Sequence, residues 1–276
     1  MSDIGFMQGR LSDMVDGMIQ AFPWSEWQEE FPRAQGIGLT AMEWTLDHDR
    51  LYENPLMTAM GQTEIGNLCQ NHSISIPSLT GDCFMQAPFW KESGAERDSL
   101  KEDFISIVDA CEAVGIKHIV VPLVDNGSIV NPEQEDVLVE FLRNLSDDLA
   151  SRKMCVVFES DFEPENLLRF MDRLDASVFG INYDIGNSAA MGFDAKQELS
   201  VYGHRILNVH VKDRLLGGTT VPLKTGAADF TNAFKALERC GYSGNFILQT
   251  ARAKDGEHAK ALEYYKDLVV NWLGEN

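Results

Sequence analysis

The sequence predicts an α/β fold, a (β/α)8 TIM barrel made of a single domain, on three observations. Eight short β-rich runs recur along the 276 residues. The segments between them have the 3.6-residue periodicity of amphipathic helices, and no Pro/Gly-rich linker interrupts the alternation. Strands that are apolar nearly throughout and alternate with helices are typical of a parallel sheet covered by helices. Eight such units favour closure into a barrel, which commonly uses about 250 residues, so we expect one domain over residues 1–276.

The expected strands lie, in chain order, at residues 4–10, 38–46, 73–82, 117–125, 153–161, 178–187, 205–213 and 245–251. The expected helices with the clearest apolar stripes span residues 99–115, 132–152 and 257–273. In the first of these helices, Gly115 is placed to end the helix. The second begins after Asn131, a good N-cap, with Pro132 at the first helical position. The third is amphipathic and would close the ring of helices.

Composition excludes several classes of protein. The net charge of −20 repels polyanions, so nucleic-acid binding is not expected. The longest strongly apolar runs have fewer than ten residues by count along the chain, against the roughly 20 needed to span a bilayer. The five cysteines show no CxxC spacing, and the N-terminus lacks a basic region followed by an apolar one. Free thiols and a cytoplasmic location are therefore expected. No GxGxxG follows the first strand to support dinucleotide binding.

Polar residues with metal-binding side chains end the last four expected strands: Glu159, Asp184, His210 and Gln249. In an α/β barrel, chemistry lies at the carboxyl ends of the strands because the following loops converge there. Hard divalent cations prefer oxygen ligands, and Mn²⁺ also accepts an imidazole. Each residue alone is weak evidence, but four such groups at consecutive strand ends predict one Mn²⁺ or Mg²⁺ site.

These strand-end motifs resemble those of the xylose isomerase-like TIM barrels, a family that includes sugar and sugar-phosphate isomerases and epimerases. The resemblance covers essentially the whole chain. It rests on VVFESD, YDIGN and NVHVKDR, followed by VPLKTGAADF, and MQGRL at the start is similar to a subset of the family. The resemblance implies a Mn²⁺- or Mg²⁺-dependent enzyme that moves a proton of a polyol ketone or aldehyde through an enediolate. The ion would act as a Lewis acid.

Gln249 departs from the family pattern. In the family the fifth- and eighth-strand glutamates bind the metal and act as acid and base, and by position these residues are Glu159 and Gln249. A glutamine offers a carbonyl oxygen to a metal but cannot take or return a proton at neutral pH. Inversion of a carbon centre usually needs a base on each face, whereas aldose–ketose isomerisation can use one base. We therefore expect one-base isomerisation with Glu159 as the catalytic base, unless another acid such as Glu43 or Asp82 reaches the second face. We also expect weak metal binding.

Five further residues are expected to contact substrate: Lys212, Asn187, Asp82, Glu43 and Arg214. Lys212 follows His210 by two, and residues two apart share a face of a strand, so its ammonium would neutralise an enediolate or hold a phosphate. Asn187 stands where the family often has a histidine that contacts substrate oxygen, and it can hydrogen-bond without titrating. Arg10 in MQGR is equally compatible with a functional and a structural role.

Alternatives to the isomerase stay open on the sequence alone. A polyol dehydratase or lyase would use the same metal ligands, and a catalytically silent barrel would bind a sugar without turning it over. The abasic-site endonuclease branch would need more strand-end histidines for a three-metal cluster and a less negative charge. The expected partner is a small-molecule sugar or sugar phosphate, with no nucleic acid and no membrane. Exposed helical faces are compatible with a homodimer.

Overall fold

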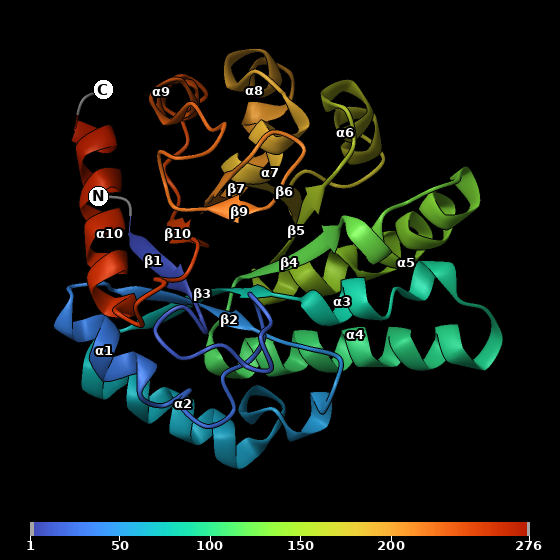
Figure 1. The fold of residues 1–276 in the computed structure, drawn as a ribbon. Helices are drawn as coiled ribbons and strands as arrows, with labels where there is room; N and C mark the ends of the chain where they lie inside the picture. Colours follow the sequence, from blue (N-terminus) through green and yellow to red (C-terminus); the bar gives the residue numbers. More distant parts are fainter. Residues whose placement is uncertain (1–2, 275–276) are drawn as a thin grey trace. The chain divides into compact units, whose positions relative to one another are not determined.

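Eight strands pair in parallel and form a closed barrel in the order β1-β10-β7-β6-β5-β4-β3-β2, which confirms the predicted fold class. The structure is a computed structural model that describes residues 3–274 (Figure 1). Each of the eight predicted runs contains one barrel strand. In chain order the strands are β1 (Ile4–Met7), β2 (Ala41–Thr45), β3 (Ser75–Thr80), β4 (His118–Leu123), β5 (Cys155–Ser160), β6 (Phe179–Asp184), β7 (Ile206–Val211) and β10 (Phe246–Leu248).

The helices follow the strands along the chain. They are α1 (Glu30–Gly36), α2 (Ala59–His72), α3 (Asp82–Gln86), α4 (Gly94–Val114), α5 (Pro132–Arg152), α6 (Pro164–Met171), α7 (Ile185–Met191), α8 (Ala195–Tyr202), α9 (Phe230–Arg239) and α10 (His258–Gly274). Short 3-10 helices lie at Leu51–Glu53, Pro55–Met57, Phe89–Lys91, Asp125–Gly127 and Gly203–Arg205. Among the described residues, no helix is both long and apolar enough to cross a bilayer.

The best-predicted helix is α5, which has the bounds expected from the sequence. The Asn131 side chain accepts a hydrogen bond from the backbone N–H of Gln134 at 2.9 Å, which caps the first turn. Gly115 ends α4 as expected, in the left-handed conformation with φ of 88°. However, α4 begins at Gly94, five residues before the start expected from the apolar stripe. The extra turn is polar, and apolar periodicity therefore gave no signal for it.

The chain divides into two compact units. The first consists of Met1–Glu43, Leu68–Ser75 and Asn182–Asn276, and the second of Trp44–Asn67 and Ile76–Ile181. The core of the second unit contains a cluster of phenylalanines. The rings of Phe84 and Phe104 lie 4.6 Å apart, and those of Phe89 and Phe141 lie 4.8 Å apart. These contacts pack α4 against α3, and α5 against the 3-10 helix Phe89–Lys91.

The core of the first unit includes stacked rings from its C-terminal helices. Phe230 stacks on Trp272 at 4.4 Å between centroids, and Phe234 stacks on Phe246 at 5.1 Å. In this unit β1 pairs with β10 and β2, and β10 pairs with β7. The ends of β6, β7 and β10 therefore belong to one unit, together with the loop after β1.

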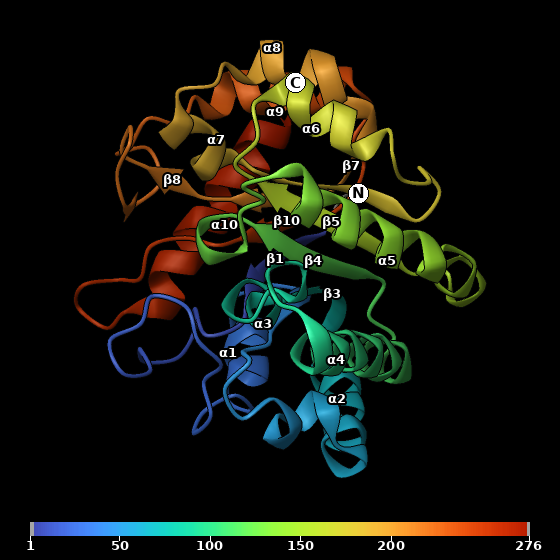
Figure 2. The same ribbon diagram turned by 90° about the vertical axis from the view of Figure 1, so that its right-hand side faces the viewer.

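A short hairpin extends beyond β7 and was not predicted. Its strands are β8 (Asp213–Arg214) and β9 (Thr220–Val221), which pair antiparallel. The hairpin lies beside α7 (Figure 2), where the backbone N–H of Gly217 donates to the carbonyl of Ala190 at 2.7 Å. The expected seventh strand at residues 205–213 thus ends earlier, at Val211, and the chain turns into the hairpin.

Candidate metal centre

Asp184 is positioned by two elements at once. It is the last residue of β6 and the N-cap of α7, where its Oδ1 accepts a hydrogen bond from the backbone N–H of Asn187 at 2.8 Å. This bond fixes the carboxylate and leaves Oδ2 directed at other partners. The helix also needs Gly186, because a Cβ there would lie 2.8 Å from the backbone carbon of Lys212.

His210, on β7, is held in a ring of hydrogen bonds among four buried side chains. Its Nε2 lies 2.7 Å from Oε1 of Glu43, and its Nδ1 lies 3.0 Å from Nδ2 of Asn182. Asn208 completes the ring because its Nδ2 donates to Oε2 of Glu43 and to Oδ1 of Asn182, each at 2.9 Å. All four side chains are at least 98% buried.

The direction of each bond in this ring follows from the carboxylate. An ionised Glu43 only accepts, so Asn208 turns its NH2 toward Glu43 and Asn182. Asn182 then presents its own NH2 to Nδ1 of His210. The imidazole in this arrangement carries its proton on Nε2 and donates it to Glu43, while Nδ1 accepts from Asn182, so a metal ion at Nδ1 would take the place of that hydrogen bond. A neutral imidazole with a carboxylate behind it is the usual form of a metal-binding histidine.

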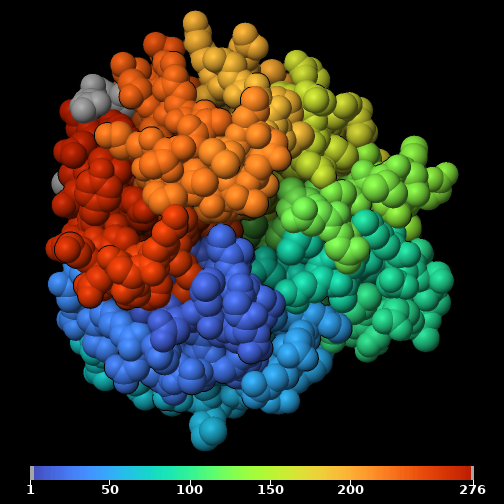
Figure 3. All heavy atoms as spheres, in the orientation of Figure 1, coloured from blue at the N-terminus to red at the C-terminus, as the bar shows by residue number. Residues whose placement is uncertain are grey.

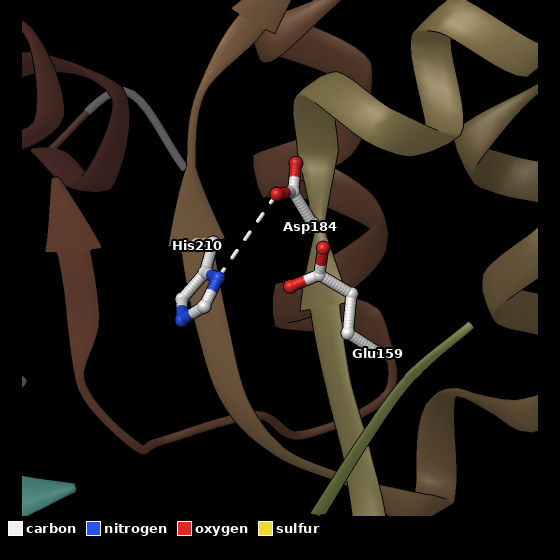
Figure 4. A group of neighbouring side chains, drawn as sticks. All are labelled: Glu159, Asp184 and His210. Atoms are coloured by element: carbon white, nitrogen blue, oxygen red, sulfur yellow. Dashed lines mark ion pairs between the residues drawn. The ribbon is translucent and has the colours of Figure 1, made fainter. Parts of the chain in front are cut away.

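The Nδ1 side of this imidazole also faces Asp184 (Figure 4). Nδ1 of His210 lies 4.0 Å from Oδ2 of Asp184. Gln249, directly after β10, donates its backbone N–H to the carbonyl of Val211 at 3.1 Å. This bond continues the pairing with β7 by one residue and keeps the Gln249 side chain beside that strand.

A lysine ammonium lies between two of the expected ligands. Nζ of Lys212 is 3.3 Å from Oδ2 of Asp184 and 3.3 Å from Oε1 of Gln249. Lys212 thus lies beside two of the expected metal ligands, and its contact with a substrate stays a prediction. The two oxygens hold a cation in this arrangement, and the Lys212 side chain is 13% exposed.

Glu159, Asp184 and His210 form the group of carboxylate and imidazole side chains that could hold a metal ion in the part of the chain described (Figure 4). All three are buried. Two carboxylate oxygens and one imidazole nitrogen fit a divalent cation of the Mn²⁺ or Zn²⁺ type. The fit rests on this donor set, whose ligand atoms all lie within 4.8 Å of one another.

The other expected substrate residues have partners inside the protein. Both carboxylate oxygens of Glu43 are bonded within the ring, which gives this residue an orienting position behind His210. Arg214 donates to Oδ1 of Asn187 at 2.8 Å and to the carbonyl of Gly218. Asp82 begins α3 and is buried. Direct substrate contact by these residues stays a prediction.

The VPLKTGAADF stretch is held by Asp213. The buried carboxylate of Asp213 accepts the backbone N–H groups of Thr225, Gly226 and Ala228 at 2.9–3.1 Å. A Cβ on Gly226 would lie 2.2 Å from Oδ1 of Asp213, so only glycine fits there. The motif is thus a structural clamp of the loop before α9.

The sequence reasoning missed Glu30, which clamps the loop after β1. Its fully buried carboxylate accepts the backbone N–H groups of Gly9 and Leu11 at 2.8–2.9 Å. Burial raises the pKa of Glu30 to about 7, against the lowering effect of these hydrogen bonds and of Arg252. The stretch FPWSEWQEEF shows no motif that marks Glu30, because the bond spans 19–21 residues of sequence. Asn182 and Asn208 were also missed, although polar residues at a spacing of two in apolar strands were a usable signal.

Comparison with known proteins finds relatives over most of this chain. An L-ribulose-5-phosphate 3-epimerase of Salmonella paratyphi A is 26% identical over 271 residues, which cover 90% of this chain and 92% of the relative. An inosose dehydratase of Geobacillus thermodenitrificans is 28% identical over 175 residues, or 53% of this chain and 58% of the relative. The crystal structure of the IOLI protein with a binding zinc atom has a TM-score of 0.72 at 17% identity, covering 99% of this chain and 98% of that one. The model of the xylose isomerase-like TIM barrel family matches residues 31–268, and the chain therefore belongs to that family.

Proposed function

We propose that this chain is a divalent-metal-dependent sugar or sugar-phosphate isomerase that works through an enediolate with one catalytic base. The ion would be held by Glu159, Asp184, His210 and Gln249, with Mn²⁺ or Mg²⁺ as the physiological candidates. The epimerase relative, which aligns along nearly its whole length, supports a sugar-phosphate substrate. The fold neighbour whose crystal structure contains a bound zinc atom supports a metal in a barrel of this kind.

The observation that carries the one-base chemistry is the amide at position 249. Its Oε1 lies 3.3 Å from the Lys212 ammonium, and its Nε2 lies 2.9 Å from Oε1 of Gln20. An amide so placed offers an oxygen to a cation but no titratable group to the substrate. Glu159 then remains as the base that takes a proton from one carbon and returns it to the next.

Each protein group has a separate part in this proposal. A bound divalent ion would supply Lewis-acid stabilisation of the negative charge that develops on the substrate oxygens. Glu43 holds His210 in the tautomer that a metal needs. Lys212 can turn from Asp184 and Gln249 to the substrate and pair with the enediolate or a phosphate. With two carboxylates in place of three, the site should bind a divalent cation more weakly than the family pattern does.

The test is deuterium exchange at carbon in D2O, measured by NMR with a panel of ketoses, aldoses and their phosphates at saturating Mn²⁺. Glu159→Gln should lower the exchange rate by about 10²–10⁴-fold, the usual contribution of a general base. Gln249→Ala should keep measurable exchange once Mn²⁺ is saturating. The exposed Glu163 gives the matched control, since Glu163→Gln should leave the rate unchanged.

Two outcomes would contradict the isomerase. Equal loss in Glu159→Gln and Gln249→Ala, with Mn²⁺ binding intact in both, would mean that Glu159 contributes no more to the exchange than a residue that cannot titrate, and is therefore not the catalytic base. No exchange with any sugar of the panel would favour the catalytically silent sugar-binding barrel.

A polyol dehydratase is the second candidate, because the inosose dehydratase relative matches about half of the chain. Such an enzyme would use the same base to remove a proton and return it to the hydroxyl of the neighbouring carbon, which leaves as water. The same NMR experiment separates the two reactions, since dehydration removes one carbon-bound hydroxyl whereas isomerisation keeps the composition of the sugar.

A further inference from the structure

A chain of hydrogen bonds links the loop after β1 to the candidate metal centre. Nη2 of Arg10 donates to Oε1 of Gln20 at 3.1 Å, and Nε2 of Gln249 donates to the same oxygen at 2.9 Å. Oε1 of Gln249 accepts from Nζ of Lys212, which also contacts Asp184. All five residues belong to one of the two compact units.

The two ends of this chain determine the orientation of both amides. A guanidinium has no acceptor, so Arg10 requires the carbonyl oxygen of Gln20. That oxygen in turn requires the NH2 of Gln249, which turns the carbonyl of Gln249 toward Lys212. An ammonium also has no acceptor, so the same orientation follows independently from Lys212.

We propose that Gln20, held by Arg10, is a positioning residue that fixes the amide of Gln249 with its carbonyl oxygen toward the cation position. The same contact adapts the site to glutamine at position 249. A glutamate there would place a carboxylate oxygen where Nε2 now lies, 2.9 Å from the Gln20 oxygen. Two acceptors at that distance repel, and the Gln20 amide cannot turn over without facing its NH2 to Arg10.

The loop that carries Gln20 is anchored by two arginines. Nη1 of Arg10 donates to the carbonyl of Ile19 at 2.9 Å, directly before Gln20. Arg252, from the segment after β10, donates to the carbonyls of Ser12 and Ile19. In the space-filling view the N-terminal segment, in blue, lies against the C-terminal segment, in red (Figure 3). Gln20 is therefore held beside Gln249 by bonds to the segment that directly precedes it.

This inference deepens the proposed function, because it treats Gln249 as a selected ligand and not as a lost base. The hydrogen-bond chain itself does not depend on a metal. A double-mutant cycle can therefore test it without activity, using the wild type, Gln249→Glu, Gln20→Met and the double variant. Methionine keeps the length of the side chain and removes the carbonyl acceptor.

The first readout is the melting temperature in EDTA. Gln249→Glu should lower the melting temperature by about 3 °C more in the wild-type background than in the Gln20→Met background. The effects of two substitutions are additive when the residues are far apart and non-additive when they are in contact. Any gain from the ion pair with Lys212 is common to both backgrounds and cancels. The second readout is Mn²⁺ affinity, measured by calorimetry. Gln249→Glu should increase this affinity about tenfold more in the Gln20→Met background than in the wild-type background.

Two control variants keep the result interpretable. Gln35 is an exposed glutamine that bonds to His72 and takes no part in the hydrogen-bond chain. Gln249→Glu should therefore lower the melting temperature equally in a Gln35→Met background and in the wild type. Gln20→Glu keeps an acceptor for both donors and should retain the wild-type Mn²⁺ affinity even where Gln20→Met lowers the melting temperature strongly.

Additive effects of Gln20→Met and Gln249→Glu, within about 1 °C, would overturn the positioning role of Gln20. A coupling of opposite sign would also overturn it. Failure of the wild type to bind Mn²⁺ would instead count against the proposed metal-dependent isomerase, while the melting cycle still decides the role of Gln20.

Discussion

At the scale of single residues, the candidate metal centre depends on buried side chains that orient the expected metal ligands without being ligands themselves. Glu43 is fully buried and 167 residues from His210 in the sequence, yet it sets the tautomer of that imidazole. Glu43 was visible in the sequence as a carboxylate within the second strand, and it lies in the middle of β2. Its partner was not visible, because a contact between distant strands follows from the closed register and not from local periodicity.

Replacing Glu43 by glutamine should weaken metal binding with little change in the ligands themselves. The amide can present either an oxygen or an NH2 to Nε2, so the proton of His210 is no longer confined to that nitrogen. We expect Mn²⁺ affinity to fall about 10–100-fold, the usual cost of losing the partner behind a metal-binding histidine. Calorimetric titration with Mn²⁺ measures this. Glu238→Gln, at an exposed carboxylate, is the control, and unchanged affinity in Glu43→Gln would contradict the orienting role.

At the scale of elements, the sequence predicted the features with local causes best. Helix α5 has its predicted bounds because Asn131 and Pro132 mark its start chemically. The first strand is shorter than predicted and ends at Met7, because Gly9 has φ of 88° and the chain turns there. The β8–β9 hairpin was missed because two-residue strands have no periodicity to detect.

The loop before α9 offers a direct test of an element held by one carboxylate. Gly226→Ala places a methyl group into the position of the Asp213 carboxylate, so at least one of three backbone N–H groups loses its acceptor. A buried donor without a partner costs about 1–3 kcal/mol, and we expect the melting temperature to fall by about 4 °C or more. Thermal unfolding followed by circular dichroism measures the change.

Gly66→Ala is the matched control for this substitution. A Cβ on Gly66 meets no atom within 4 Å, and the residue lies inside α2, where alanine favours the helix. Its melting temperature should equal or exceed that of the wild type. A Gly226→Ala variant as stable as Gly66→Ala would show that Asp213 does not hold the loop.

At the scale of the whole molecule, the regular alternation of strand and helix was sufficient to predict the barrel. It also indicated which strand ends carry polar groups, because the carboxyl ends of parallel strands meet at one face. The alternation of strands and helices does not indicate which side chains hold the loops in place by hydrogen bonds. Glu30 is a case in point: its partners Gly9 and Leu11 lie in a different loop, and nothing in the local sequence distinguishes it from the exposed Glu29.

The buried Glu30 makes the stability of the whole fold depend on pH. Its pKa is about 7 in the folded state, against an ordinary value of 4.5, because burial disfavours the charged form. The folded protein thus holds the proton more tightly than the unfolded chain. The stability contributed by Glu30 is fully present below pH 4.5, declines as the pH rises from 4.5 to about 7, and changes little above that.

Glu30→Gln removes this titration and should therefore remove the decline. The difference in unfolding free energy between wild type and variant should shift by on the order of 3 kcal/mol in favour of the variant between pH 4.5 and 7.5. Urea unfolding at a series of pH values measures the shift, and Glu29→Gln, at the exposed neighbour, should show the wild-type pH dependence. Parallel profiles for wild type and Glu30→Gln would mean that Glu30 has the same proton affinity in the folded and unfolded chains, so that its hydrogen bonds from Gly9 and Leu11 balance the cost of burial.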